Sequence, residues 1–297
     1  MSQAAVKSGL SPRRIPTRTP GPAPAARARP PDLEAKFAEL QKDYAELHTA
    51  IFEAAQVHRR LCAPRLLCYD DFEIASEIFA VRHLPGDFFI VDEIGDELIL
   101  ALGDICGKGL SAGMWTTHIA GLVRANTARA STAEEIMTQV NADLCRMPLR
   151  AFASLFLARL DPLSGALHYS SAGHPPALLL RGDASLERLS EGGLLLGVLD
   201  DAQYTCGTVE LNPGDMLVTY SDGITESLNN RGEEFGYARL EAQMRQARAA
   251  SADSVLFSVL GAVQDFAGTR PLVDDMSLAV VQRAKSDALK LRNVRAA

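Results

Sequence analysis

Apolar residues recur at alternating intervals of four and three near the start of the chain. The series is Leu33, Phe37, Leu40, Tyr44, Leu47, Ile51, Ala54, His58 and Leu61. An apolar residue every 3.5 positions forms the seam of a coiled coil, so the pattern predicts a dimerising linker helix over 32–63 that ends before Pro64. An amphipathic helix lying on the following domain would give a similar pattern. Dimerisation, or binding of a regulatory partner, is expected to depend on Leu40, Leu47 and Ile51.

From residue 66 onward the pattern changes to short strands interrupted by pairs of helices. Strand composition marks 72–82, 88–94, 98–105, 152–160, 166–171, 177–181, 208–211, 216–220 and 276–282. Helices are expected at 109–129, at 237–249, at 252–267 and after a cap at Ser131 or Thr132, with Glu134 and Glu135 placed for a capping box. Because the helices come in consecutive pairs, the order predicts an α+β fold with antiparallel sheets flanked by helical hairpins.

Composition limits the kinds of partner. The 297 residues are 47% hydrophobic with a net charge of −7, which gives no reason to expect nucleic acid or an anionic membrane as a partner. No apolar run approaches the ~20 residues of a membrane span, and no two cysteines form a Cys-x-x-Cys pair, so we expect a cytoplasmic protein with reduced thiols. Residues 1–31, basic and proline-rich, are expected to be a disordered arm rather than a mitochondrial presequence. Residues 285–297 are expected to be a flexible tail.

Two aspartates are expected to face each other across a hairpin. If Gly95-Asp96 forms the turn, Asp87 pairs with Asp104. Opposed side chains lie ~5 Å apart, where two carboxylates repel by roughly 3 kcal/mol at an effective dielectric near 20. Such a pair persists when a cation lies between the carboxylates or when one of them holds a proton. The hairpin therefore indicates a metal site.

The glycine-rich run after Asp104 admits other interpretations. Gly107-Lys108-Gly109-Leu110-Ser111-Ala112 fits the fingerprint of a dinucleotide-binding loop. That site needs a second parallel strand ending in an acidic residue, whereas here one helix is followed by another. A Walker loop is excluded because Gly109, not Ser or Thr, follows Lys108. The sequence also lacks the Gly-x-Ser-x-Gly elbow of the hydrolases.

Further acidic residues lie at strand ends. Asp222 follows the strand 216–220, and Asp274-Asp275 precede the last strand. Any single Asp-Gly pair is ordinary turn sequence. Four acidic strand ends together favour Mg²⁺ or Mn²⁺ over zinc, because hard oxygen ligands occur here without a histidine cluster.

A series of short motifs surrounds these acidic residues. They are Pro85-Gly86-Asp87-Phe88, Gly103-Asp104-Ile105-Cys106-Gly107-Lys108-Gly109, Ser171-Ala172-Gly173-His174-Pro175-Pro176, Leu196-Gly197-Val198, Pro213-Gly214-Asp215, Tyr220-Ser221-Asp222-Gly223-Ile224-Thr225-Glu226, Phe235-Gly236 and Asp274-Asp275-Met276-Ser277. In order and spacing, residues 66–284 resemble the serine/threonine phosphatases of the metal-dependent protein phosphatase 2C (PPM) superfamily. Within it they are similar to the bacterial SpoIIE/RsbU branch, which regulates partner-switching pathways.

This resemblance implies a four-layer αββα sandwich of two antiparallel sheets flanked by helical pairs, preceded by the coiled-coil helix. It also implies two ions of Mn²⁺ or Mg²⁺ per site, bridged by Asp104, that activate a shared water for attack on phosphate. The implied ligands are Asp87, Asp104, the carbonyl of Ile105, Asp222 and Asp274, with Asp275 as the alternative to the last. Gly107, Lys108 and Gly223 are candidate phosphate or substrate contacts, although Lys108 is equally well explained as a solvated side chain.

The function implied is a protein serine/threonine phosphatase, acting on a phosphorylated STAS-type anti-sigma-factor antagonist in a partner-switching pathway of sigma-factor regulation. The alternative is a non-catalytic dimeric adaptor on a degenerate phosphatase scaffold. It is motivated by Pro85, where the family usually has glycine, and by Ile90, where an acidic residue is common. Cys106 replaces a usual serine and is interpreted either as an oxidisable thiol or as a small buried residue.

Overall fold

The computed structural model describes residues 31–62 and 66–285. The expected arm therefore lies outside the described residues except for residue 31, and the expected tail lies outside them except for residue 285. The described residues form two units, with the boundary between His48 and Thr49. The linker helix α1 (Pro31–Cys62) crosses this boundary and agrees with the predicted range to within one residue at each end.

The part of α1 in the first unit leaves its predicted seam in solvent. Between 57% and 69% of each seam residue's surface is exposed at Leu33, Phe37, Leu40, Tyr44 and Leu47. A row of large apolar side chains in water is unfavourable for an isolated helix. This part of α1 therefore presents an apolar stripe that the described residues do not cover.

The second unit contains two β-sheets. The first sheet has the spatial order β1 (Leu66–Tyr69), β2 (Phe72–Phe79), β12 (Met276–Arg283), β11 (Met216–Tyr220), β7 (Ala177–Leu180) and β8 (Leu186–Leu189). The second has the order β10 (Gly207–Glu210), β6 (Ala166–Ala172), β5 (Ala153–Leu160), β4 (Glu97–Ile105) and β3 (Asp87–Ile94), with β9 (Gly192–Gly193) beside β6. Neighbouring strands pair antiparallel except for the short β6–β9 pair.

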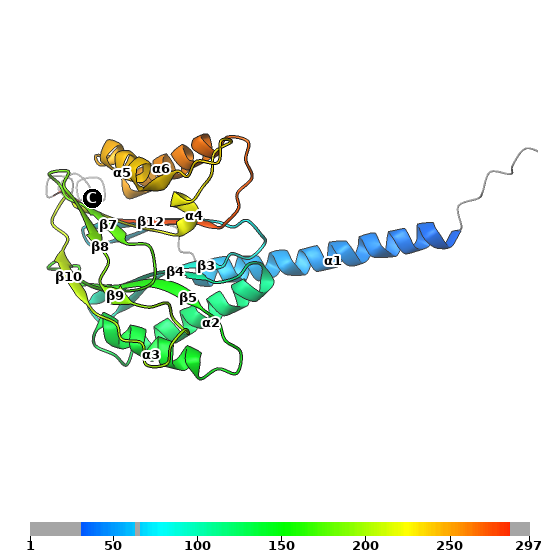
Figure 1. Cartoon of the computed structure of the whole chain (residues 1–297), viewed down its shortest axis with the longest axis horizontal. Helices are drawn as coiled ribbons and strands as arrows, with labels where there is room; N and C mark the ends of the chain where they lie inside the picture. The colour runs from blue at the N-terminus through cyan, green and yellow to red at the C-terminus, as the bar shows by residue number, and fades with distance from the viewer. Residues whose placement is uncertain (1–30, 63–65, 286–297) are drawn as a thin grey trace, which may run out of the picture. The chain divides into compact units, whose positions relative to one another are not determined.

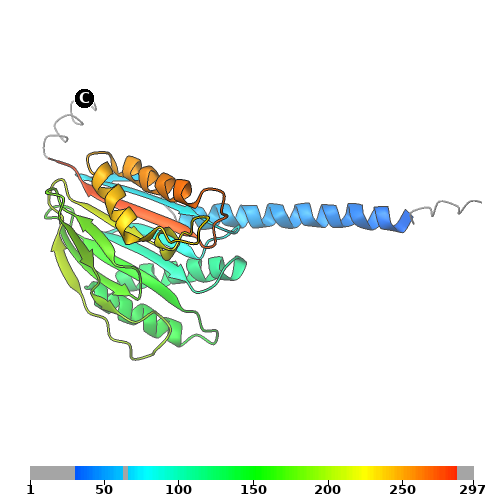
Figure 2. The same ribbon diagram turned by 45° about the horizontal axis from the view of Figure 1, so that its top comes forward.

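Paired helices cover the outer face of each sheet, which confirms the expected four layers (Figure 1). The helices α2 (Leu110–Thr127) and α3 (Ala133–Cys145) pack on β3 to β6, and α6 (Ala252–Ala267) packs on β2 and β12 beside α5 (Gly236–Ala247). Figure 2 shows α6 lying along β12. The short α4 (Asp222–Thr225) follows β11 directly. None of the helices in the described ranges has both the length and the apolar character needed to cross a bilayer.

Side-chain alternation along the strands produces three hydrophobic clusters. On β4, Leu100 and Leu102 point into the cluster between the sheets, whereas Ala101 points toward α2 and α3. On β12, Val281 lies between the sheets and Val280 lies under α6. Because successive strand residues face opposite sides, apolar residues at every position allow each sheet to be buried on both faces.

The expected local signals are present. Asp87 is paired with Asp104, which confirms the hairpin register. Thr132 caps α3, with Glu135 completing the capping box. The short elements β1, β8, β9 and α4 carry no pattern that the sequence interpretation recognised.

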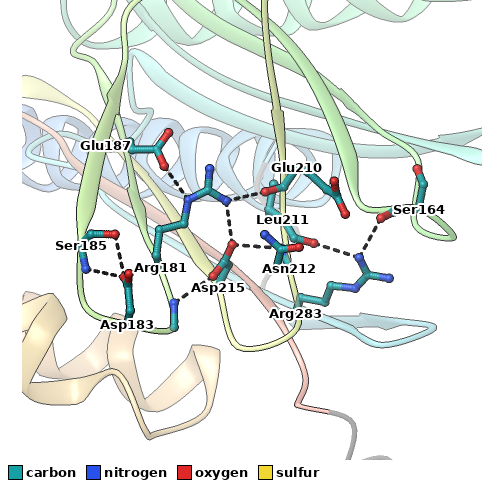
Figure 3. Close-up of polar contacts among 11 residues, drawn as sticks. Ser164, Arg181, Asp183, Ser185, Glu187, Glu210, Leu211, Asn212, Asp215 and Arg283 are labelled. Carbon is teal, nitrogen blue, oxygen red and sulfur yellow. Dashed lines mark hydrogen bonds and ion pairs between the residues drawn. The ribbon is translucent and has the colours of Figure 1, made fainter.

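One end of the sandwich is held by an ion pair and by hydrogen bonds from two arginines (Figure 3). Asp215, just before β11, accepts hydrogen bonds from Arg181 Nη1 at 2.8 Å and from the amides of Gly182 and Asn212 at 2.9 and 3.0 Å. Arg283, at the end of β12, donates to the carbonyls of Ser164 and Leu211, both at 2.9 Å. Three loops are thus fixed by two arginines.

The last turns of α1 belong to the second unit and contact it. His58 and Cys62 are buried, at 4% and 0% exposure. Arg59 Nη2 lies 2.9 Å from Glu77 Oε1 on β2, and Arg124 of α2 donates to the carbonyl of Leu61 at 3.0 Å. His58, a predicted seam residue, is therefore packed against the domain.

Candidate metal centre

The β3–β4 hairpin places two carboxylates opposite each other. Asp87 is 1% exposed and lies across from Asp104. Burial, followed by the charge of Asp104, raises the pKa of Asp87 well above its ordinary value. Burial, followed by the charge of Asp222, raises the pKa of Asp104. Without a cation the pair is therefore driven to retain protons, as expected for like charges in a buried site.

The opposite sheet supplies a hydrogen bond to this pair. Ser277, on β12, donates from Oγ to Asp87 Oδ2. Ser277 is tied to Ser221, after β11, because the amide of Ser277 donates to Ser221 Oγ at 3.0 Å. Both serines were quoted only as motif neighbours of aspartates in the sequence. Their role depends on the approach of the two sheets, which no local pattern indicates.

The loops after β11 and before β12 bring Asp222 close to Asp274. A Cβ on Gly223 would lie 2.0 Å from the carbonyl oxygen of Asp275, so the two loops touch backbone to backbone and only glycine fits. Burial, followed by the charge of Asp274, raises the pKa of Asp222. The four predicted acidic strand ends thus influence one another electrostatically.

Asp275, the alternative ligand, has other partners. Its Oδ1 accepts the amide hydrogen of Val81 and its Oδ2 that of Gly86, each at 2.7 Å. Asp275 is only 8% exposed. The carboxylate therefore fixes the β2–β3 loop just before Asp87, and this arrangement favours Asp274 over Asp275 as a metal ligand.

Three oxygens converge beside Gly86. A Cβ at this position would lie 3.3 Å from Asp104 Oδ1, from the carbonyl oxygen of Ile105 and from that of Gly107. The Ile105 side chain is buried on the helix side, while its carbonyl belongs to this group of oxygens. A carboxylate and two carbonyls are ligands of the kind that Mg²⁺ and Mn²⁺ take, so the residues present fit a divalent cation.

Lys108 bonds to the loop that carries Asp274. Its Nζ lies 2.8 Å from Asp274 Oδ2 and donates to the carbonyl of Val273 at 2.7 Å. Neither interpretation made from the sequence, a phosphate contact or a solvated side chain, included this pairing. Within residues 31–62 and 66–285, no three His, Cys, Asp or Glu side chains already form a cluster ready to hold a metal ion.

Ile90 and Cys106, two departures from the family pattern, lie in different environments. Ile90 is fully buried in the cluster under the helices. Cys106 is exposed, so its interpretation as a small buried residue is wrong. Partial desolvation of its thiol, followed by the charges of Asp104 and Asp222, raises the pKa of Cys106. His174 is buried, its Nδ1 lies 2.7 Å from Ser154 Oγ, and burial lowers its pKa to about 3. His174 is therefore neutral at ordinary pH and supports β5 behind Asp104.

Similar proteins have been characterised in several bacteria. The chain is 24% identical to the phosphoserine phosphatase RsbU of Bacillus subtilis over 242 residues, which cover 80% of this chain and 71% of RsbU. It is 27% identical to the protein IcfG of Synechocystis sp. over 198 residues, which cover 57% of this chain. The chain spans only 31% of the length of IcfG.

Solved structures share the fold. The PP2C domain of SiaA from Pseudomonas aeruginosa superposes with a TM-score of 0.70 at 16% identity, over 81% of this chain and 98% of that domain. The catalytic domain of the serine/threonine protein phosphatase PstP, crystallised with two manganese ions, superposes with a TM-score of 0.52 at 15% identity, over 72% of this chain and 99% of that domain.

Residues 94–284 match the family model described as stage II sporulation protein E (SpoIIE). The match covers more than half of the chain, and it includes three of the four predicted acidic strand ends. The match begins within β3 and does not include Asp87. The position of Asp87 in the site therefore follows from its pairing with Asp104 in the structure. The chain belongs to the SpoIIE family.

Proposed function

We propose that this protein is a divalent-metal-dependent phosphatase acting on phosphoserine or phosphothreonine in a protein. The observation that carries the proposal is the electrostatic influence among four acidic strand ends, two from each sheet. Asp87 and Asp104 come from one hairpin, and Asp222 and Asp274 from the loops of β11 and β12. Asp104 raises the pKa of Asp87, and Asp274 raises that of Asp222, so the excess negative charge at this end of the sandwich favours a cation.

The ligands in this proposal are Asp87, Asp104 with the Ile105 carbonyl, Asp222 and Asp274. When bound, two Mn²⁺ or Mg²⁺ ions would neutralise phosphate oxygens and lower the pKa of a water that attacks phosphorus. The chain's own residues orient this site. Ser277 holds Asp87, and Asp275 holds the loop before it. The raised pKa of the Cys106 thiol makes it a poor nucleophile. The proposed reaction does not depend on it, because the attacking group is water rather than a side chain.

The proposed substrate is a phosphorylated STAS-type protein in a partner-switching pathway. Support comes from the similarity to RsbU, which is named a phosphoserine phosphatase, over 80% of this chain. The two manganese ions in PstP, which shares the fold, support the choice of metal. We place this activity in the cytoplasm, where such a pathway operates.

The test measures phosphate release from a phosphoserine STAS protein with and without Mn²⁺. Asp104→Asn is expected to lower the rate by about 10²- to 10³-fold, because a charge at the reacting centre is lost. Asp96→Asn, at the exposed turn of the same hairpin, is the matched control and should leave the rate unchanged. A folded wild-type protein that releases no phosphate with Mn²⁺ or Mg²⁺ would overturn the proposal in favour of a non-catalytic adaptor.

We further propose that the exposed stripe of α1 forms a coiled coil with a second copy of the chain, which a regulatory partner can also engage. Support comes from the exposed seam of the first unit, and from the last turns of α1, where Arg59 and His58 contact the domain. Leu40→Asp and Leu47→Asp are expected to give monomers by light scattering and altered activity, whereas Gln41→Asp, off the seam, is not. If both seam variants kept the oligomeric state and the activity of the wild type, this proposal of regulation through α1 would be refuted.

A further inference from the structure

Lys108 supplies a positive charge within the acidic centre. Its ammonium contacts one carboxylate oxygen of Asp274 at 2.8 Å and the Val273 carbonyl at 2.7 Å. The other carboxylate oxygen of Asp274 accepts the amide hydrogen of Asp275 at 3.0 Å. Both oxygens of Asp274 are therefore engaged by the protein itself.

The positive charge of Lys108 also acts on a second carboxylate, that of Asp222. It opposes the rise in the pKa of Asp222 that burial and Asp274 cause. Asp222 and Asp274 flank the contact of Gly223 with the Asp274-Asp275 backbone. Lys108 thus reduces the excess negative charge on the same pair of carboxylates that a divalent cation would neutralise.

This contact can be broken without unfolding. The side chains of Lys108 and Asp274 are 36% and 47% exposed, and ion pairs that reach solvent contribute little to stability. The lysine stem is flexible and its ammonium is a single point charge. A divalent ion that is bound by several oxygen ligands interacts more strongly with the Asp274 carboxylate than the Lys108 ammonium does.

We propose that Lys108 is an internal counter-cation that occupies Asp274 and competes with a divalent metal ion for it. The proposal rests on the proposed metal-dependent function. Metal binding at Asp274 then requires the Lys108 ammonium to leave both Asp274 and the Val273 carbonyl. Lys108 lowers the affinity of the ion that uses Asp274, and it keeps the loop 270–274 in place when that ion is absent.

The experiment measures Mn²⁺ binding to the full chain by isothermal titration calorimetry at low ionic strength. Lys108→Met keeps most of the apolar stem and removes the charge, and Lys108→Ala removes both. Each is expected to tighten the weaker Mn²⁺ site by roughly two- to fivefold, the range that follows from removing one partly exposed ion pair. Lys108→Arg, which keeps the charge, should bind Mn²⁺ nearly as the wild type does.

Arg82→Met is the matched control. Arg82 lies on the β2–β3 loop, and its side chain is 3.5 Å from the Cβ position of Gly109. Its loss therefore removes one positive charge beside the loop that carries Lys108 and leaves the Lys108–Asp274 contact in place. Unchanged or weaker Mn²⁺ binding in both Lys108→Met and Lys108→Ala would overturn the proposal while leaving the metal-dependent function intact. Equal tightening in Arg82→Met would also overturn it, because the effect would then be general electrostatics. If the wild type and every variant bound no Mn²⁺, the proposed function would fail as well.

Discussion

The two ends of the β11–β12 pair differ in how far their carboxylates are neutralised by neighbouring groups. At the end shown in Figure 3, Asp215 is matched by Arg181 and two amides. At the other end, Asp222 and Asp274 raise the local negative charge, and one lysine only partly offsets it. The carboxylate at the first end is neutralised by the protein, whereas the second end keeps an excess of negative charge. Acidic strand ends are therefore informative only when their partners are known.

Asp222→Asn is expected to have the largest effect. Phosphate release should fall by about 10²- to 10³-fold, because the site loses a charge that holds the proposed metal. The metal-free melting temperature should not fall, since burial and Asp274 disfavour the Asp222 carboxylate. Calorimetry beside the activity assay checks both. An inactive variant that also melts early would mean that Asp222 stabilises the fold rather than serving the site.

Asp215→Ala should show the reverse behaviour. Removing the carboxylate leaves the amides of Gly182 and Asn212 unsatisfied and leaves Glu187 as the remaining acidic partner of Arg181, so the free energy of unfolding should drop by about 3 kcal/mol. Urea unfolding measures the loss. Activity per folded molecule should persist below the transition, and a specific loss of activity would contradict the division between the two ends.

Gly223→Ala tests the close contact between the acidic loops. The added Cβ would meet the Asp275 carbonyl at 2.0 Å, and relieving this clash should cost about 2 kcal/mol and displace Asp274. Gly121→Ala in α2, where a Cβ meets no atom within 4 Å, is the control. Weaker Mn²⁺ binding in Gly223→Ala alone is the expected result, and equal behaviour of the two variants would refute it.

The metal-free protein should lose stability as pH rises. The folded-state pKa values of Asp87 and Asp104 lie above the ordinary 3.8, so the folded state holds more protons than the unfolded one in that window. The free energy of unfolding should therefore fall above pH 3.8 by about 1.4 kcal/mol per pH unit for each additional proton that the folded state holds, until the raised pKa is passed. Urea unfolding with EDTA measures this slope. Mn²⁺ should abolish this dependence of stability on pH. If Asp87→Asn left the slope unchanged, the assignment of the slope to Asp87 and Asp104 would be wrong.

Sequence patterns predicted what depends on neighbours along the chain. The turn at Gly95-Asp96 set the register of Asp87 with Asp104, and helical periodicity located the paired helices. The partners of Asp275 and Lys108 were not predictable, because they lie on segments far away in sequence. The heptad series likewise did not reveal that His58 packs on the domain.

The bond between Ser277 and Asp87 has a consequence for the order of folding. It joins residues 190 positions apart, and contacts of such long range close late because a large loop must be ordered first. Among the strands in the described residues, β12 comes last along the chain and is therefore synthesised after the others. A nascent chain can form the β3–β4 hairpin early, yet the carboxylate of Asp87 gains its hydrogen bond from Ser277 only after β12 has been made.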